Sequence, residues 1–292
     1  MRNSCEEYSL RVFSAYIYAL FISAALLALP ADAWALTPRY IDPGYSFSVF
    51  ATIGVSIDAL EVDSAGSIFV VDNSYWGTGT VFIDRYDAAD SYVSASIYTS
   101  YTPKNNHANG MVFDGLGNMY TIECSGKKDS GVIHKIDNLL ATETYYKMWN
   151  ICPTGIAADT SGNLFITGRS GADLLFGNIY ALDADKELKV VVPDFVGEGI
   201  ALDRAGNIFA VNWLDNSLYM FEAETYTPFL IATFDIVPDG VSVDAFGNIY
   251  VFENTGYGDP RPTPILRFVP VVRTPVLETA PEAASARQAR SR

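Results

Sequence analysis

Five near-copies of one short string constrain this fold more than any other feature of the sequence. The first is DSAGSIFVVD at residues 63–72, and the others begin at positions 114, 159, 203 and 244. Each has an aspartate, a glycine three residues later and then an apolar run, which is typical of a β-hairpin. The aspartates are 51, 45, 44 and 41 residues apart. A period of about 40–50 residues containing only strand signals predicts the four-stranded blades of a β-propeller.

The repeat count predicts an all-β propeller with five blades. The last blade has no convincing fourth strand after residues 264–272, whereas an unassigned strand at 45–53 precedes the first blade. We expect this N-terminal strand to close the ring as the outer strand of blade five, because closure leaves no raw edge at the seam. A sixth blade would have to be degenerate, and no stretch of chain is left for it.

The two ends of the chain are expected to lie outside the ring. Residues 1–35 have a polar start, a long apolar run and small residues near position 35, the layout of a secretory signal peptide. An N-terminal membrane anchor is the alternative, since the apolar run is long for a signal. The Ala-, Glu- and Arg-rich residues 273–292 are predicted to be disordered. This leaves one propeller domain at residues 36–272, in a secreted or periplasmic protein without membrane insertion after cleavage.

Net charge limits the partners that the chain can bind. The full sequence has a formal net charge of −15, and without residues 1–35, which hold two basic and three acidic side chains, it is −14. Such a chain is repelled by phosphate backbones, so nucleic acid is excluded as a partner. Divalent cations, small ligands or a protein partner fit better, and we expect a monomer.

Acidic and amide residues recur where the first and second strands of each blade meet one rim. In a four-stranded blade the first strand starts and the second strand ends on the same rim, so these positions should crowd one mouth of the central channel. The residues before the first strands are Asp58, Asn109, Thr154, Glu198 and Asp239. The residues at the ends of the second strands are Asp72, Glu123, Gly168, Asn212 and Glu253.

This mouth is a candidate metal site. Converging carboxylates repel one another, and the ten positions include no Lys or Arg, so a bound cation would relieve the repulsion. Ca²⁺ prefers a shell of carboxylate and amide oxygens. The alternative is that Asp and Asn before a glycine serve only as turn residues and cap strand ends in water.

The strings HANGMVFDGLGNMYTIE and PDGVSVDAFGNIYVFEN resemble strand starts of the SMP-30/gluconolactonase family, within a wider group of calcium-dependent propellers. They are also similar to NHL repeats. The similarity covers roughly residues 54–270. In the lactonases a Glu, an Asn and an Asp at such strand starts hold the metal, and the Asp is the general base. The family has six blades, whereas this sequence has five repeats.

The resemblance implies roles for particular residues. Asn109 matches the Asn-Gly start and Asp239 the Asp-Gly start, with Asp239 as the catalytic base. Glu198 resembles the Glu-Gly start, although it stands elsewhere in the chain order, and Asp58 occupies the first-blade place of the family's Glu. The implied metal ligands are Asp58, Asn109, Glu198 and Asp239.

Several other residues are candidates for ligand contact or proton transfer. His107 precedes Asn109 by two residues and could transfer a proton near the metal, or be a solvated loop residue. We expect His134 to be structural and outside the channel. No evident substrate-binding arginine follows from the pattern, and Arg169 is a candidate only. The remaining candidate ligand-binding residues are Glu123, Asn212, Trp213 and Glu253.

The cysteines and the missing motifs narrow the function further. Cys124 and Cys152 are an even pair in an exported chain, which permits one disulfide. We place Cys152 at the end of the outer strand of blade two, on the same rim as Cys124. A G-x-S-x-G motif, a P-loop and a dinucleotide fingerprint are all missing from the sequence. Two functions remain: a metal-dependent hydrolase of lactones or esters, or a non-catalytic NHL-type propeller that holds a ligand, glycan or protein.

Overall fold

The computed structural model describes residues 36–63, 65–72, 79–92, 95–102, 108–124, 130–170, 175–253 and 262–271. The predicted signal peptide and the predicted disordered tail both lie outside these residues. Across the described ranges no helix is long and apolar enough to span a membrane.

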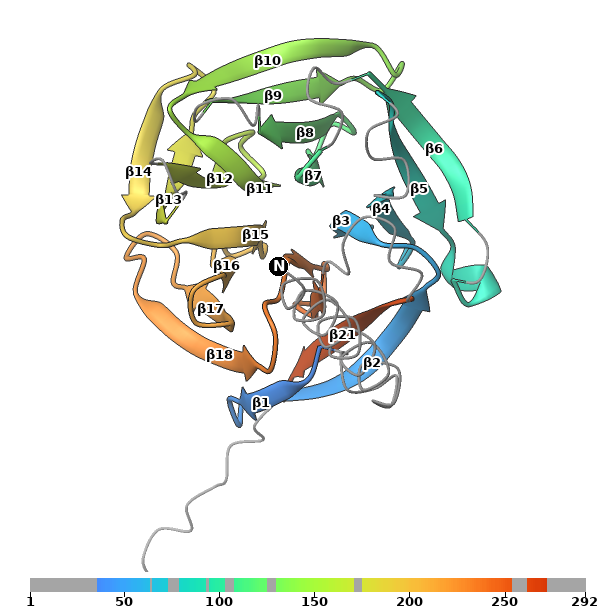
Figure 1. Ribbon diagram of the computed structural model, residues 1–292, viewed down its shortest axis with the longest axis vertical. Helices are drawn as coiled ribbons and strands as arrows, with labels where there is room; N and C mark the ends of the chain where they lie inside the picture. Colours follow the sequence, from blue (N-terminus) through green and yellow to red (C-terminus); the bar gives the residue numbers. More distant parts are fainter. Residues whose placement is uncertain are drawn as a thin grey trace, which may run out of the picture.

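Five antiparallel sheets are arranged around one central axis, which confirms the prediction of a five-bladed propeller (Figure 1). Blade one contains β3 (Ile57–Val62), β4 (Ile68–Asp72), β5 (Val81–Tyr86) and β6 (Ala95–Tyr101). Blade two contains β7 (Gly110–Phe113), β8 (Met119–Cys124), β9 (Ser130–Ile136) and β10 (Thr142–Trp149). Blade three contains β11 (Cys152–Ala158), β12 (Leu164–Ser170), β13 (Phe176–Leu182) and β14 (Leu188–Val192).

The last two blades include strands from the N-terminal part of the chain. Blade four contains β15 (Gly197–Leu202), β16 (Ile208–Asn212), β17 (Ser217–Phe221), β18 (Pro228–Phe234) and, at its outer edge, β1 (Pro38–Ile41). Blade five contains β19 (Gly240–Val243), β20 (Ile249–Phe252), β21 (Thr263–Pro270) and β2 (Tyr45–Ile53). The element between β5 and β6 is a single 3₁₀ turn, Ala88–Asp90.

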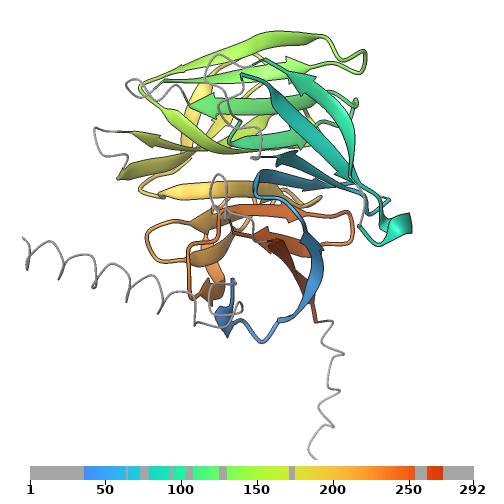
Figure 2. The ribbon, with the colours of Figure 1, turned by 45° about the vertical axis from the view of Figure 1, so that its right-hand side comes forward.

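Closure of the ring follows the prediction and adds one strand to it. β2 pairs antiparallel with β21, from Tyr45 opposite Pro270 to Ile53 opposite Thr263. β1 was not predicted; it pairs with β18, so the N-terminal segment spans the outer edges of blades four and five (Figures 1 and 2). Leu36, just before β1, is buried in the apolar cluster between these two blades.

The apolar character of both faces of the inner strands is explained by packing between blades. On β20, for example, Val251 joins a cluster shared with blade four, whereas Tyr250 and Phe252 join a cluster shared with blade one. Each inner sheet is therefore covered on both sides, and the simple polar–apolar alternation of a half-exposed sheet is absent.

The repeated Asp-x-x-Gly-Asn string forms the turn between the first two strands of a blade. In blade two the Asp114 carboxylate accepts the backbone N–H groups of Leu116 and Asn118 at 2.9 and 2.8 Å and the side-chain amide of Asn118 at 2.7 Å. Gly117 has a φ of 82°, a value that favours glycine. The string recurs because each blade needs this turn.

Cys124 and Cys152 form a disulfide, and it joins two blades. The prediction that Cys152 ends the outer strand of blade two is wrong, because Cys152 is the first residue of β11, the innermost strand of blade three. The two Cα atoms lie 4.9 Å apart, and the bond links the end of β8 to the start of β11.

Candidate functional site at the channel mouth

The inner strands β3, β7, β11, β15 and β19 contact one another in sequence around the axis (Figure 1). The five ring residues stand just before these strands or within their first three positions, so they lie at one end of the channel. This is the mouth that the repeat predicted.

Glycines make this mouth narrow. A Cβ placed on Gly199 would lie 2.6 Å from the Cα of Gly240 in the next blade, and one on Gly155 would lie 3.0 Å from the Cα of Gly199. The backbones of neighbouring inner strands are therefore too close for any side chain at these positions. The cavity left at the throat is about 20 Å³. That space holds one water molecule or one ion.

Three of the five ring residues, from the adjacent blades five, one and two, line this throat: Asp239, Asp58 and Asn109. The Oδ1 atom of Asn109 is buried and has no hydrogen-bond partner. Its Nδ2 atom donates to the carbonyl oxygen of Pro153 at 3.4 Å. A buried acceptor without a donor is uncommon in proteins, and an ordered water or a bound ion is one way to satisfy it.

Asp239 is an acid of the ring with a raised pKa. Burial raises its pKa to about 7, and the nearby Arg169 guanidinium acts in the opposite direction. Burial lowers the pKa of Arg169 while Asp239 raises it. Arginine remains charged in proteins, so a permanent positive charge acts on this mouth.

Arg169 corrects the expectation that the positive charge must come entirely from outside. Its guanidinium forms an ion pair with the Glu198 carboxylate and stands 4.9 Å from the centre of the Trp213 ring. The side chains of Arg169 and Glu198 are only 11% and 16% exposed. Glu198 is thus engaged by a neighbouring blade and does not line the throat with the other three acidic or amide residues.

The fifth ring residue, Thr154, is also engaged by the protein. Its Oγ1 donates to the carbonyl oxygens of Gly197 at 2.9 Å and Thr167 at 3.3 Å. The ring therefore divides into three residues that face the throat and two, on blades three and four, that bind neighbouring side chains or backbone.

The residues at the ends of the second strands do not open onto the mouth as predicted. Glu123 is fully buried, and its Oε1 lies 2.7 Å from Nε2 of His134 on the adjacent strand β9. Asp72 and Glu253 are 6% and 4% exposed. The side chains at these three strand ends are therefore covered by the protein. His134 is structural, as expected, and His107 lies outside the described residues.

Asn212 is the last residue of β16, and Trp213 follows it. The Asn212 Oδ1 accepts the backbone N–H of Leu214 at 2.8 Å, so this oxygen stabilises its own loop. Trp213 remains 38% exposed beside Arg169. Of the predicted ligand-binding residues, Arg169 and Trp213 are the two that the structure brings together at the mouth.

One channel carboxyl group was missed. Glu61 of β3 accepts a hydrogen bond from Ser242 of β19 at 3.1 Å, and burial raises the pKa of Glu61 to about 8. The available signal was a second acid in β3, three residues after Asp58, in a strand whose other residues are apolar.

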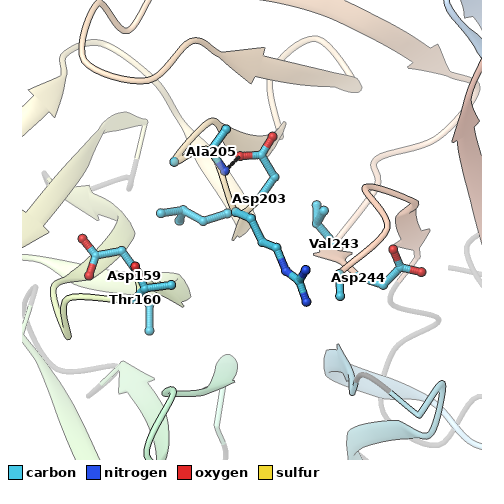
Figure 3. A pocket seen from close by; sticks show the side chains of 11 residues that line it. Asp159, Thr160, Asp203, Ala205, Val243 and Asp244 are labelled. Atoms are coloured by element: carbon cyan, nitrogen blue, oxygen red, sulfur yellow. Dashed lines mark hydrogen bonds between the residues drawn. The ribbon is translucent and has the colours of Figure 1, made fainter. Parts of the chain in front are cut away.

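A larger cavity of about 300 Å³ lies at the opposite end of the channel (Figure 3). Asp159, Asp203 and Asp244 stand around it on the turns of blades three, four and five. The Asp203 carboxylate accepts the N–H groups of Ala205 and Asn207, each at 2.9 Å, and the Asn207 amide at 2.8 Å. The other two carboxylates are engaged in the same way. We assign no ligand to this end, because its acids serve their own turns.

The throat residues fit a hard cation in part. Among the described residues no group of three or more His, Cys, Asp or Glu side chains is arranged to hold a metal. The throat instead combines two carboxylates with an amide oxygen that has no partner. Oxygen donors of these types suit Ca²⁺ or Mg²⁺ and not softer metals.

Comparison with known proteins supports the fold. The sequence model of a family described as a beta-propeller repeat matches residues 150–176. A gluconolactonase from Xanthomonas campestris has a similar structure, with a TM-score of 0.54 and 9% sequence identity over 82% of this chain and 96% of that one. A luciferin-regenerating enzyme is also similar, with a TM-score of 0.52 and 13% identity over 77% of this chain and 95% of that one. No curated protein sequence matches the chain. The resemblance to gluconolactonase-type propellers is confirmed at the level of the fold.

Proposed function

We propose that the chain is an exported hydrolase of lactones or similar esters, that it depends on a divalent cation, and that its site is the channel mouth. The observation that carries this proposal is the buried, unpartnered Oδ1 of Asn109 beside Asp58 and Asp239. The fold similarity to a gluconolactonase is consistent with it. The disulfide between Cys124 and Cys152 supports export, because disulfides persist outside the reducing cytosol.

Each throat residue would contribute an oxygen ligand. Asp58 and Asp239 would provide carboxylate oxygens, and Asn109 an amide oxygen that no protein donor occupies. Ca²⁺ or a similar ion would polarise the carbonyl oxygen of a bound ester. Asp239, whose pKa burial raises, would accept the proton of the attacking water.

The size of the throat restricts where a substrate can lie. A cavity of about 20 Å³ excludes a lactone ring, so the reacting bond would lie above the throat. On that side the cationic Arg169 and the exposed ring of Trp213 form one wall. This wall can hold a flat ring against Trp213 while guanidinium N–H groups bind an oxygen of the substrate.

A second function is favoured by the same wall. The ion pair between Arg169 and Glu198 already neutralises part of the mouth without any metal. The mouth could then hold a small ligand, a glycan or a protein segment through Trp213 and Arg169 with no reaction, as a binding propeller does.

A panel of lactones and aryl esters distinguishes the two functions. We expect the purified protein to hydrolyse at least one member, to lose activity on chelation and to regain it with calcium. Asp239→Asn should lower turnover by roughly 100-fold or more, the usual contribution of a general base. Asp203→Asn, the same change at the opposite end of the channel, is the matched control and should remain active. Calcium binding without turnover of any member would favour the binding function.

A further inference from the structure

Two backbone carbonyl groups from two blades hold Asn109, one through its main chain and one through its side-chain amide. Its backbone N–H donates to the carbonyl oxygen of Ile122 in β8 at 2.9 Å. Its side-chain Nδ2 donates to the carbonyl oxygen of Pro153 in β11 at 3.4 Å. A carbonyl oxygen only accepts hydrogen bonds, so the nitrogen end of the amide must face Pro153 and Oδ1 must face away. Pro153 therefore decides which end of Asn109 is left without a partner.

The disulfide ties together the two strands that hold Asn109. Cys152 directly precedes Pro153, and Cys124 follows Ile122 by two residues. The bond between the cysteines joins the end of β8 to the start of β11, with Cα atoms 4.9 Å apart. It lies one or two residues from each backbone acceptor, so it fixes the distance between them. The chain has three cysteines, which means that at most one such link can be formed.

Packing holds Pro153 from a second side. A Cβ placed on Gly131 of β9 would lie less than 3.0 Å from the ring of Pro153. The proline ring is thus in close contact with the backbone of blade two. Cys152 is 4% exposed and Cys124 is half-buried, so little free space surrounds this junction.

We propose that the disulfide between Cys124 and Cys152 is a positioning element of the cation site. It sets the spacing between Ile122 and Pro153, and through them it aims the Oδ1 of Asn109 into the throat. Breaking it lets β11 move away from β8, so that the amide of Asn109 can turn and its oxygen leaves the site. This role rests on the proposed function, since it requires that a cation binds at the mouth.

Calcium affinity, measured by calorimetric titration, tests this role. We expect Cys124→Ser/Cys152→Ser to weaken calcium binding about 10-fold, since loss of groups that orient a ligand typically costs 10–100-fold in metal affinity. The stability control is Leu36→Ala, which removes a buried side chain between blades four and five. It should lower the melting temperature comparably and leave the calcium Kd unchanged.

A double-mutant cycle separates positioning from general loosening. In an Asn109→Ala background the cysteine replacements should change the Kd by less than twofold, because the oxygen that they position is already gone. Gly131→Ala displaces Pro153 with the disulfide intact and should weaken calcium binding as the cysteine replacements do. It replaces the cysteine variant in this test if that variant does not fold.

Two results overturn different statements. The positioning role is wrong if the wild-type protein binds calcium and the cysteine replacements leave the Kd unchanged. It is also wrong if they weaken calcium binding equally with and without Asn109. In both cases the cation site itself remains. If the wild-type protein binds no calcium, the proposed cation site is wrong, and this role of the disulfide falls with it.

Discussion

The two ends of the central channel use the same residue type for different purposes. At the turn end, five aspartates stand at equivalent positions, and the side chain of each accepts hydrogen bonds from its own turn. At the mouth, the five equivalent positions hold Asp, Asn, Thr, Glu and Asp. Here Asn109 has an oxygen without a partner, and Asp239 has its pKa raised by burial.

This difference separates architecture from function within one molecule. A residue that recurs unchanged in every blade has a structural role that every blade shares. For the turn aspartates this role is to accept hydrogen bonds from the turn. A residue that differs from blade to blade breaks the symmetry of the ring, and Asp58, Asn109 and Asp239 break it on three adjacent blades. A polar atom that is buried without a partner costs stability, and the Oδ1 of Asn109 is such an atom, which is why we propose a ligand at this end.

The largest stability effect is expected from the glycines that narrow the mouth. In Gly155→Ala the new Cβ would lie 2.7 Å from Oγ1 of Thr167 and 3.0 Å from the Cα of Gly199. Overpacking of this kind costs about 1–3 kcal/mol, so the melting temperature should fall by roughly 3–10 °C. Gly115→Ala, at the turn end, has no atom within 4 Å and should change it little. Equal shifts in the two variants would contradict a mouth narrowed by glycine.

Replacing one aspartate at each end should produce opposite results. Asp203→Ala removes three hydrogen bonds of its turn and should cost about 1–2 kcal/mol, as loss of a helix cap does. Asp239→Ala removes a buried acid and should leave the melting temperature without calcium unchanged or higher. Thermal melting of both variants in a chelator checks this. A marked loss of stability in Asp239→Ala would mean that the acids at the mouth also serve structure.

The smallest effect concerns Asp84 of β5, a buried acid away from the residues that line the throat. Burial, and secondly Asp72, raise the pKa of Asp84 from its ordinary value of 3.8 to about 6. The folded protein thus holds this proton more tightly than the unfolded chain. The resulting stability is complete below about pH 4 and is lost as the pH rises through 6.

Asp84→Asn removes this titration. At pH values above 6 it should stabilise the folded protein by roughly 1 kcal/mol and raise the melting temperature by a few degrees. At pH 4 it should give no gain. Melting curves from pH 4 to pH 8 for both proteins measure it. A difference that does not change with pH would show that Asp84 keeps its ordinary pKa.

The fold could be predicted from the sequence because the repeat is a local signal. Each Asp-x-x-Gly turn fixes the register of one hairpin, and the count of turns gives the count of blades. The extra strand β1 was missed because Pro38–Ile41 is short and lies outside the repeat, so only pairing with β18 makes it a strand. Cys152 was placed in the wrong blade because the crossover between β10 and β11 is only two residues long.

The site was predicted less completely, because its contacts cross between blades. The pattern of strand starts placed Asp58, Asn109 and Asp239 on one ring. It could not show that Arg169 reaches Glu198, since the two residues belong to different repeats. It also placed Glu123 at the open mouth, whereas covering by the neighbouring blades turns this carboxylate toward His134.

The most direct test of the account is a calorimetric titration of calcium into the wild-type protein and two variants, Asn109→Ala at the mouth and Asp203→Ala at the turn end. We predict one calcium ion per wild-type chain, binding weakened at least 10-fold in Asn109→Ala, and wild-type affinity in Asp203→Ala. No calcium binding by the wild-type protein, or an affinity that depends on Asp203 and not on Asn109, would contradict the assignment of function to the mouth.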